Sequence, residues 1–257
     1  MPRETPTNYY RLHTDDMVSK PKLYVIATEG RSTEFKYFKE LRKQYSSKFN
    51  EQNLHVEILR RPSKQNGHSS PKDVEQMLKE FLEDNRDYEL KSYDELWLII
   101  DTDTWEQQTI KQLAEKCKTE TLYHFGLSNP CFEIWLILHL IDSNEDVRHV
   151  FVTHAQNAPL IKECIEKFEN NSSNLSLKKC IEEMTRWEKR SKTCKQLLGL
   201  IHRFYNISIP KELIDYIPQA ISRAKELGEC NPDDAHYPEN ICTSIYKLLE
   251  TLTQQIK

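Results

Sequence analysis

The stretch LWLIIDTDTW, residues 96–105, sets an apolar run directly against two aspartates that are separated by one residue. A short and nearly continuous apolar run is typical of a strand that is covered on both faces of a parallel sheet. Asp101 and Asp103 follow this strand, and in extended backbone they lie on the same side, about 6–7 Å apart. Carboxylates at that spacing repel each other, so the pair indicates either a bound cation or solvated loop residues.

Three further segments have strand patterns, and helical patterns lie between them. Ser70 and Pro71 have the chemistry of an N-cap and a first helical position at the start of one such helix. Alternation of strands and helices predicts an α/β fold with a mainly parallel sheet flanked by helices. The expected strands are residues 22–28, 54–59, 96–100 and 121–127.

After residue 142 the strand signals end, and apolar residues recur at spacings of three and four. We therefore expect an α/β domain over residues 20–145 and a helical C-terminal region over residues 150–257. The 257 residues provide enough length for one large domain or two modest ones, each with a hydrophobic core.

The composition is typical of a globular protein, with 38% apolar and 30% charged residues. A formal net charge of −4 excludes a uniformly basic nucleic-acid-binding surface, although local basic patches remain compatible with it. The longest apolar patch, residues 132–141, is too short to span a membrane and contains Glu133 and His139. We interpret His139 as a core histidine with a hydrogen-bond partner. No membrane partner is expected.

The seven cysteines show no C-x-x-C motif, and the histidines show no spacing typical of structural zinc. We interpret the cysteines as reduced thiols. The first sixteen residues lack the apolar segment of a secretion signal. Together these features predict a cytoplasmic protein.

Ligands of open parallel sheets bind beyond the carboxyl ends of the strands. The first expected strand is followed by Glu29 and the third by Asp101 and Asp103, so three carboxylates would meet at one edge. Mg²⁺ is usually held by one or two carboxylates together with waters and substrate phosphates. The pattern therefore predicts a site for Mg²⁺ (or Mn²⁺). The alternative is that Glu29 caps the following helix and the aspartates are solvated.

The motifs ATEG (27–30), IIDTDTW (99–105) and SNPCFEIWLILHL (128–140) together resemble the RloB-like family, whose core is similar to a Toprim domain. The resemblance implies Mg²⁺-dependent phosphodiester chemistry, because Toprim domains occur in nucleases, primases and topoisomerases. It also implies an association with bacterial restriction and phage defence. It covers about residues 20–250, since the segments WEKR, AISRAKEL and PENICTSIYKLLETL resemble the closing helices of the family.

The resemblance implies a role for each matching residue. Glu29 matches the general acid/base and metal ligand of the Toprim motif, and Asp101 and Asp103 match its metal-binding pair. Glu133 falls in the first turn of the helix that follows Pro130. Its carboxylate either complements the helix dipole or acts in catalysis, as a ligand of a second ion or as an orienting group.

Phosphate groups of a substrate need cations near these carboxylates. The loop residues expected at the same edge of the sheet are basic, and residues 186–203 contain six basic side chains against one acidic side chain. Runs of this kind also occur on solvated helix faces, and Trp105 suits packing as well as base stacking. The candidate substrate-binding residues are Arg31, Arg60, Arg61, Lys64 and Lys189.

The leading hypothesis is a metal-dependent nuclease that cleaves phosphodiester bonds of DNA or RNA, tRNA included, in bacterial phage defence. Its expected partners are the nucleic-acid substrate and, for restraint of the activity, either another protein of a defence system or a homo-oligomer. The alternative is a non-catalytic subunit that binds nucleic acid or a partner. A phosphatase or phosphotransferase ranks third, because the D-x-D of aspartate-nucleophile phosphatases follows the first strand and here it follows the third.

Overall fold

The computed structural model describes nine ranges of the chain, and all structural statements below concern them. These ranges are residues 21–30, 32–60, 70–85, 89–102, 105–150, 158–168, 174–182, 187–231 and 240–256.

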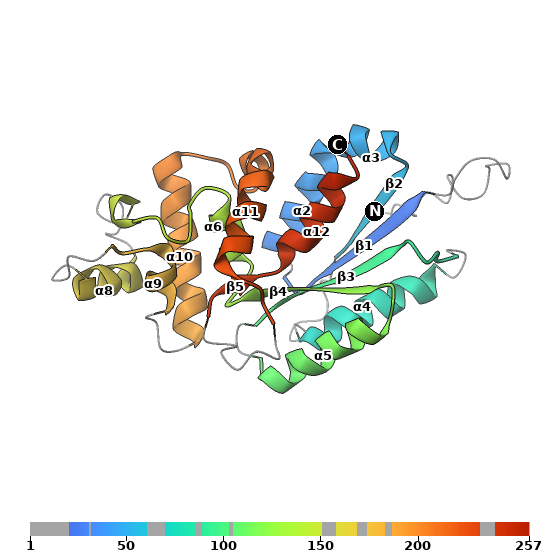
Figure 1. The fold of residues 1–257 in the computed structure, drawn as a ribbon, viewed down its shortest axis with the longest axis horizontal. Helices are drawn as coiled ribbons and strands as arrows, with labels where there is room; N and C mark the ends of the chain where they lie inside the picture. The colour runs from blue at the N-terminus through green and yellow to red at the C-terminus, as the bar shows by residue number, and fades with distance from the viewer. Residues whose placement is uncertain are drawn as a thin grey trace.

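A five-stranded sheet of order β2-β1-β3-β4-β5 forms the centre of the fold (Figure 1). The first four strands pair in parallel, as the alternation of strands and helices predicts, and β5 pairs with β4 in the antiparallel direction. Their bounds are β1 Lys22–Thr28, β2 Leu54–Leu59, β3 Glu95–Asp101, β4 Tyr123–Asn129 and β5 Cys242–Thr243.

The C-terminal region that is expected to be helical, residues 150–257, contributes the short strand β5 to the sheet. This strand has two residues, which is too short for any apolar periodicity to be visible in the sequence. It is held by its pairing with β4 and by a hydrogen bond of 3.0 Å between the buried hydroxyls of Ser128 and Thr243.

Helices cover both faces of the sheet (Figure 1). One face carries α2 (Thr33–Gln44), α3 (Ser46–Glu51) and α12 (Ile245–Gln254), and the other carries α4 (Pro71–Asp84) and α5 (Gln107–Thr119). The predicted start of α4 is confirmed: Ser70 and Asp73 form a reciprocal capping box, and Pro71 is the first helical residue.

Alternation along β1 explains why its apolar run is nearly continuous. Tyr24 and Ile26 join the hydrophobic cluster on the α2 and α12 face. Leu23, Val25 and Ala27 point the other way and join the cluster on the α4 and α5 face. Each apolar residue of the strand is therefore buried by one of the two helical layers.

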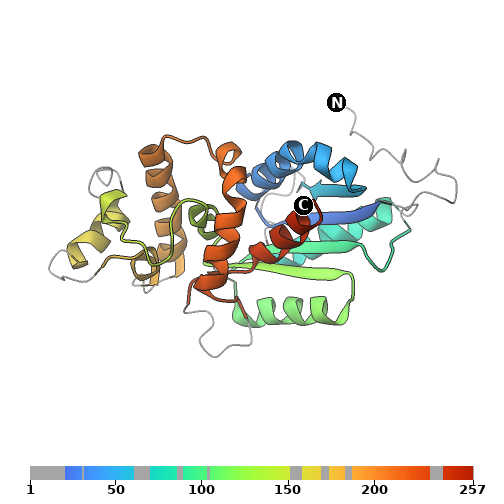
Figure 2. The same cartoon turned by 45° about the horizontal axis from the view of Figure 1, so that its top comes forward.

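The chain leaves the sheet after β4 and builds a helical region. Figure 2 shows α11 standing between this region and the sheet. The cluster on the α2 and α12 face continues into the helical region without interruption, because it includes residues of α6, α10 and α11. The division near residue 145 stays a prediction. The elements are α6 (Glu133–Leu138), α8 (Pro159–Phe168), α9 (Leu177–Glu182), α10 (Trp187–Tyr205), the 3₁₀ helix η2 (Lys211–Tyr216) and α11 (Ile217–Leu227).

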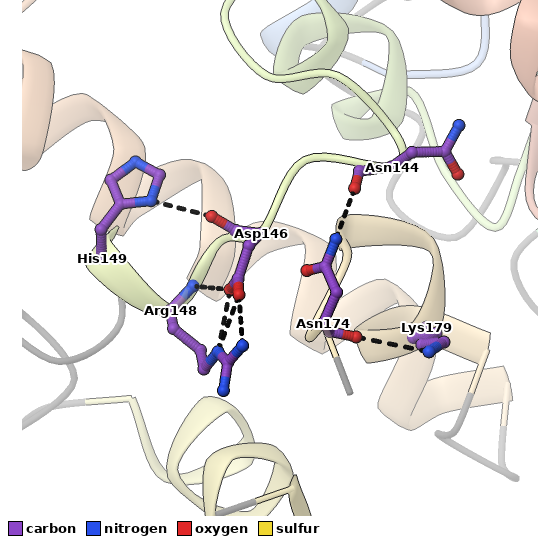
Figure 3. A network of polar contacts seen from close by, with 6 residues as sticks. All are labelled: Asn144, Asp146, Arg148, His149, Asn174 and Lys179. Atoms are coloured by element: carbon purple, nitrogen blue, oxygen red, sulfur yellow. Dashed lines mark hydrogen bonds and ion pairs between the residues drawn. The ribbon is translucent and has the colours of Figure 1, made fainter. Parts of the chain in front are cut away.

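The segment after α6 is joined to the segment before α9 by polar contacts (Figure 3). The Asn174 side-chain amide donates to the carbonyl of Asn144 at 3.0 Å, and Asp146 forms an isolated bridge with Ser176. The Asp146 carboxylate also pairs with the Arg148 guanidinium at 2.5 Å. This ion pair is partly exposed and lies within one segment, so it contributes only about 0–1 kcal/mol, and the two segments are joined by the hydrogen bond and the bridge.

Cys230 and Cys242 form a disulfide that joins the end of α11 to β5, with Cα atoms 5.3 Å apart. The interpretation of all seven cysteines as reduced thiols is therefore wrong for this pair. A separation of twelve residues matches no motif, and the two residues meet because β5 returns to the sheet edge. None of the helices in the described ranges is both long enough and apolar enough to cross a membrane.

Candidate functional site

The neighbouring strands β1 and β3 end at the point where the connections of the sheet diverge. The chain passes from β1 into α2 on one face, and it enters β3 from α4 on the other face. Ligands of open α/β sheets bind at such switch points. Glu29 follows β1 directly, and Asp101 is the last residue of β3.

Hydrogen bonds hold the Glu29 carboxylate between the two strand ends. Its Oε2 accepts the backbone N–H of Asp101 at 3.1 Å, and its Oε1 accepts the indole N–H of Trp105 at 2.9 Å. The backbone N–H of Glu29 donates to the carbonyl of Ile99 at 3.0 Å, which continues the strand pairing. The structure therefore brings Glu29 and Asp101 together, and it assigns Trp105 a role in orienting Glu29.

Asp101 lies among like charges. Burial raises the pKa of its carboxyl well above the usual value, and the carboxylates of Glu34, Glu29 and Glu133 raise it further. A hydrogen bond from the backbone N–H of Phe132 opposes this shift. The Asp101 carboxylate is thus desolvated beside three negative groups, an arrangement that a bound cation would stabilise.

Glu34, in the first turn of α2, is a member of this cluster that the sequence did not reveal. Its buried carboxylate folds back over Gly30, so that a Cβ placed on Gly30 would lie 1.8 Å from Glu34 Oε2. Burial and Glu133 raise the pKa of Glu34, whereas Lys195 and hydrogen bonds from backbone N–H groups lower it. The available signal was an acidic residue in the first turn of the helix that follows Glu29 and Gly30.

Glu133 completes the cluster as the first residue of α6. Its predicted place in the first turn of that helix is confirmed. It is buried, and its charge raises the pKa values of both Asp101 and Glu34. Four carboxylates from β3, α2, α6 and the end of β1 therefore face a common region, called the carboxylate site below.

A chain of buried side chains braces the carboxylate site from β4. The hydroxyl of Thr102, next to Asp101, donates to Asn129 Oδ1 at 2.8 Å. The Asn129 side-chain amide donates in turn to the carbonyl of Asn240 at 2.5 Å. The end of β3 is thereby tied to the segment that leads into β5.

The predicted substrate-binding residues fall into three groups. The Arg60 guanidinium lies over the ring of Phe35, 5.3 Å from its centroid. Lys189 pairs with Glu163 at 3.4 Å, and both side chains are partly exposed, so this pair adds little to stability. The third group, Arg31, Arg61 and Lys64, lies outside the described residues, as does Asp103.

His139 is a core residue, as predicted. The carbonyl of Trp135 can only accept a hydrogen bond, so His139 Nδ1 donates to it at 2.8 Å. The other ring nitrogen, Nε2, therefore accepts the hydroxyl of Tyr37 at 3.0 Å. Burial lowers the pKa of His139 to about 3, which keeps its ring neutral.

The chemistry of the carboxylate site fits a hard divalent cation. Its donors are all carboxylate oxygens, and its surplus negative charge is desolvated. Among the described residues, no three Asp, Glu, His or Cys side chains lie close enough to hold one metal ion. Mg²⁺ commonly takes only one or two carboxylates and completes its shell with waters and substrate phosphates, so Asp101 with one further carboxylate suffices.

Comparison with curated proteins and with solved structures yields no match. A family model described as RloB-like protein matches residues 24–252, which include most of β1, the carboxylate site and most of α12. The chain belongs to the RloB-like family.

Proposed function

We propose that the chain is a divalent-metal-dependent nuclease of the Toprim type that cleaves phosphodiester bonds of DNA or RNA in bacterial phage defence. The observation that supports it most is the carboxylate site itself, where Asp101 is desolvated beside Glu29, Glu34 and Glu133. Membership of the RloB-like family supports the same proposal. Without a cation, such a cluster costs free energy because its charges repel one another.

Asp101 and Asp103 hold the cation, with Glu133 or Glu34 available as a further oxygen ligand. When bound, Mg²⁺ or Mn²⁺ supplies activation of water and charge neutralisation at phosphorus. The Glu29 carboxylate, oriented by the Asp101 N–H and the Trp105 indole, takes or returns a proton at the reacting oxygen.

The test is a set of incubations of the purified protein with single-stranded and duplex DNA, total RNA and a phosphomonoester. Each substrate is combined with Mg²⁺, Mn²⁺ or a chelator. Wild type should cleave at least one nucleic acid with metal and none with chelator. Asp101→Asn should abolish cleavage, because the neutral amide is a poor ligand for a hard cation.

The matched control is Glu115→Gln, which neutralises an exposed carboxylate on α5 that pairs with Lys118 at 3.5 Å. This variant should cleave like wild type. Thermal unfolding separates lost chemistry from lost fold. Asp101→Asn removes a carboxyl group that lies among like charges, so its unfolding temperature should equal or exceed that of wild type.

Each contrary outcome identifies a different function. Normal cleavage by Asp101→Asn would refute the Toprim mechanism. Binding of nucleic acid without cleavage under any metal would establish the non-catalytic subunit. Turnover of the phosphomonoester alone would establish the phosphatase.

A further inference from the structure

A cavity of about 350 Å³ lies between the start of α2 and the middle of α10. Leu136, Leu198 and Ile209 form an apolar part of its lining. Its volume is near the lower end of the range of about 300–1,000 Å³ found for small-molecule sites. The cavity is therefore large enough for one unit of a nucleic-acid chain.

The polar part of the lining is basic. Lys36 comes from α2, and Lys195 and His202 come from α10. The hydroxyls of Ser32 and Thr33 lie on the same wall, and none of the described residues that line the cavity is acidic. Ammonium groups and hydroxyls are donors that suit phosphate oxygens, whereas the apolar part suits a sugar or a base.

The cavity adjoins the carboxylate site. Thr33 in its lining precedes Glu34 directly in the chain. Lys195, also in its lining, is close enough to Glu34 to lower the pKa of that carboxyl. A polyanionic chain that reaches the carboxylates from this side would pass the cations first.

We propose that the cavity between α2 and α10 holds one unpaired nucleotide of the substrate strand, with its phosphate on Lys36 and Lys195 and its sugar or base against Leu198 and Ile209. The proposal rests on the proposed function and adds to it that the substrate is single-stranded where it enters the site. A base that stays paired cannot place its sugar and base edge in a cavity of this size, because its partner strand remains attached.

The test measures binding of a labelled single-stranded oligonucleotide in the presence of chelator, so that cleavage plays no part. The variant is Lys36→Ala combined with Lys195→Ala. The matched control is Lys192→Ala, which removes an exposed lysine from the same helix, α10, outside the cavity. Thermal unfolding of each variant checks that it is folded.

The double variant should bind at least about 10-fold more weakly at low salt. Its plot of log affinity against log salt should be shallower by about 0.7, since each phosphate that is neutralised on a single strand contributes about 0.7 to the slope and the two lysines share one phosphate. Lys192→Ala should stay within about twofold of wild type. Equal affinity of the double variant and wild type, an equal loss in Lys192→Ala, or no binding by wild type would each overturn the proposal.

Competitors distinguish the sources of the phosphate. Unlabelled single strand should compete fully, whereas duplex of the same length and adenosine monophosphate should compete at least about 10-fold less well. Equal competition by duplex would refute the inference that the substrate is unpaired. Equal competition by the mononucleotide would show that the cavity is a site for a free nucleotide. If wild type cuts nothing but the double variant loses binding as expected, the nuclease fails and the cavity assignment stands.

Discussion

Replacing Gly30 with alanine should displace the carboxylate of Glu34 and thereby test whether this residue belongs to the reaction. The new Cβ would lie 1.8 Å from Oε2, 2.0 Å from Oε1 and 2.1 Å from Cδ of Glu34. Non-bonded carbon atoms rest about 3.5–4.0 Å apart, so the carboxylate must withdraw by roughly 1.5 Å. The backbone at Gly30 does not have a positive φ, so alanine itself is not strained there.

A misplacement of about 1 Å in a catalytic arrangement can cost roughly 10²-fold in rate. We therefore expect Gly30→Ala to lower the metal-dependent kcat/KM by about 10²-fold, which corresponds to about 2.7 kcal/mol of transition-state stabilisation. The free energy of unfolding should change little, because the group that moves is the end of a flexible side chain.

The assay compares initial rates of cleavage by wild type, Gly30→Ala, Glu34→Gln and the double variant. Glu40→Gln is the matched control, since Glu40 is on the same helix. Its side chain accepts a hydrogen bond from Gln44 at 3.1 Å and lies 3.9 Å from the ammonium group of Lys43. If the alanine acts through Glu34, the double variant should be no slower than Glu34→Gln alone. Full activity of Gly30→Ala, or additive losses in the double variant, would refute the role given to Glu34.

Three further predictions concern the core. Gly126→Ala places a methyl group 2.7 Å from Ile99 Cδ1, so it should cost about 1–3 kcal/mol in urea unfolding, whereas Gly199→Ala meets no atom within 4 Å and should add about 0.5–1 kcal/mol. A destabilised Gly199→Ala or a neutral Gly126→Ala would contradict this packing. Because the pKa of His139 is lowered to about 3, only the unfolded state binds its proton between about pH 6.5 and pH 3, so stability is full above this window and falls as the pH falls. The slope should be smaller in His139→Gln by up to about 1.4 kcal/mol per pH unit, and equal slopes in the two proteins would exclude a buried neutral ring. Tyr37→Phe leaves His139 Nε2 without its donor and should cost about 1–3 kcal/mol in the same urea measurement, so an unchanged midpoint would show that the bond is absent.

The sequence predicts the sheet well where burial alone decides a strand. The bounds of β1 and β2 agree with the expected residues 22–28 and 54–59, because both apolar runs stop abruptly. The expected strand 121–127 begins two residues too early and ends two residues too early. Ser128 and Asn129 are polar, yet they are strand residues because β5 pairs with them.

The sequence predicts those residues of the candidate site that lie at the ends of strands. Glu29 and Asp101 converge because both end neighbouring parallel strands, a relation that follows from the order of elements. Glu34 could not be found in this way, because its carboxylate joins the site only by folding back over Gly30. Neither the side-chain rotamer of Glu34 nor the disulfide between Cys230 and Cys242 is accompanied by a periodic pattern in the sequence.

The bracing of the carboxylate site by Asn240 has a consequence for the order of events during translation. Glu29, Asp101 and Glu133 all leave the ribosome long before the segment that carries Asn240 and β5. Until then β4 has no partner strand on the β5 side, and the hydrogen bond from the Asn129 side-chain amide to the carbonyl of Asn240 cannot form. A nascent chain therefore contains the carboxylates before the contacts that brace the carboxylate site can form. We expect the proposed nuclease to be inactive while its own mRNA is being translated.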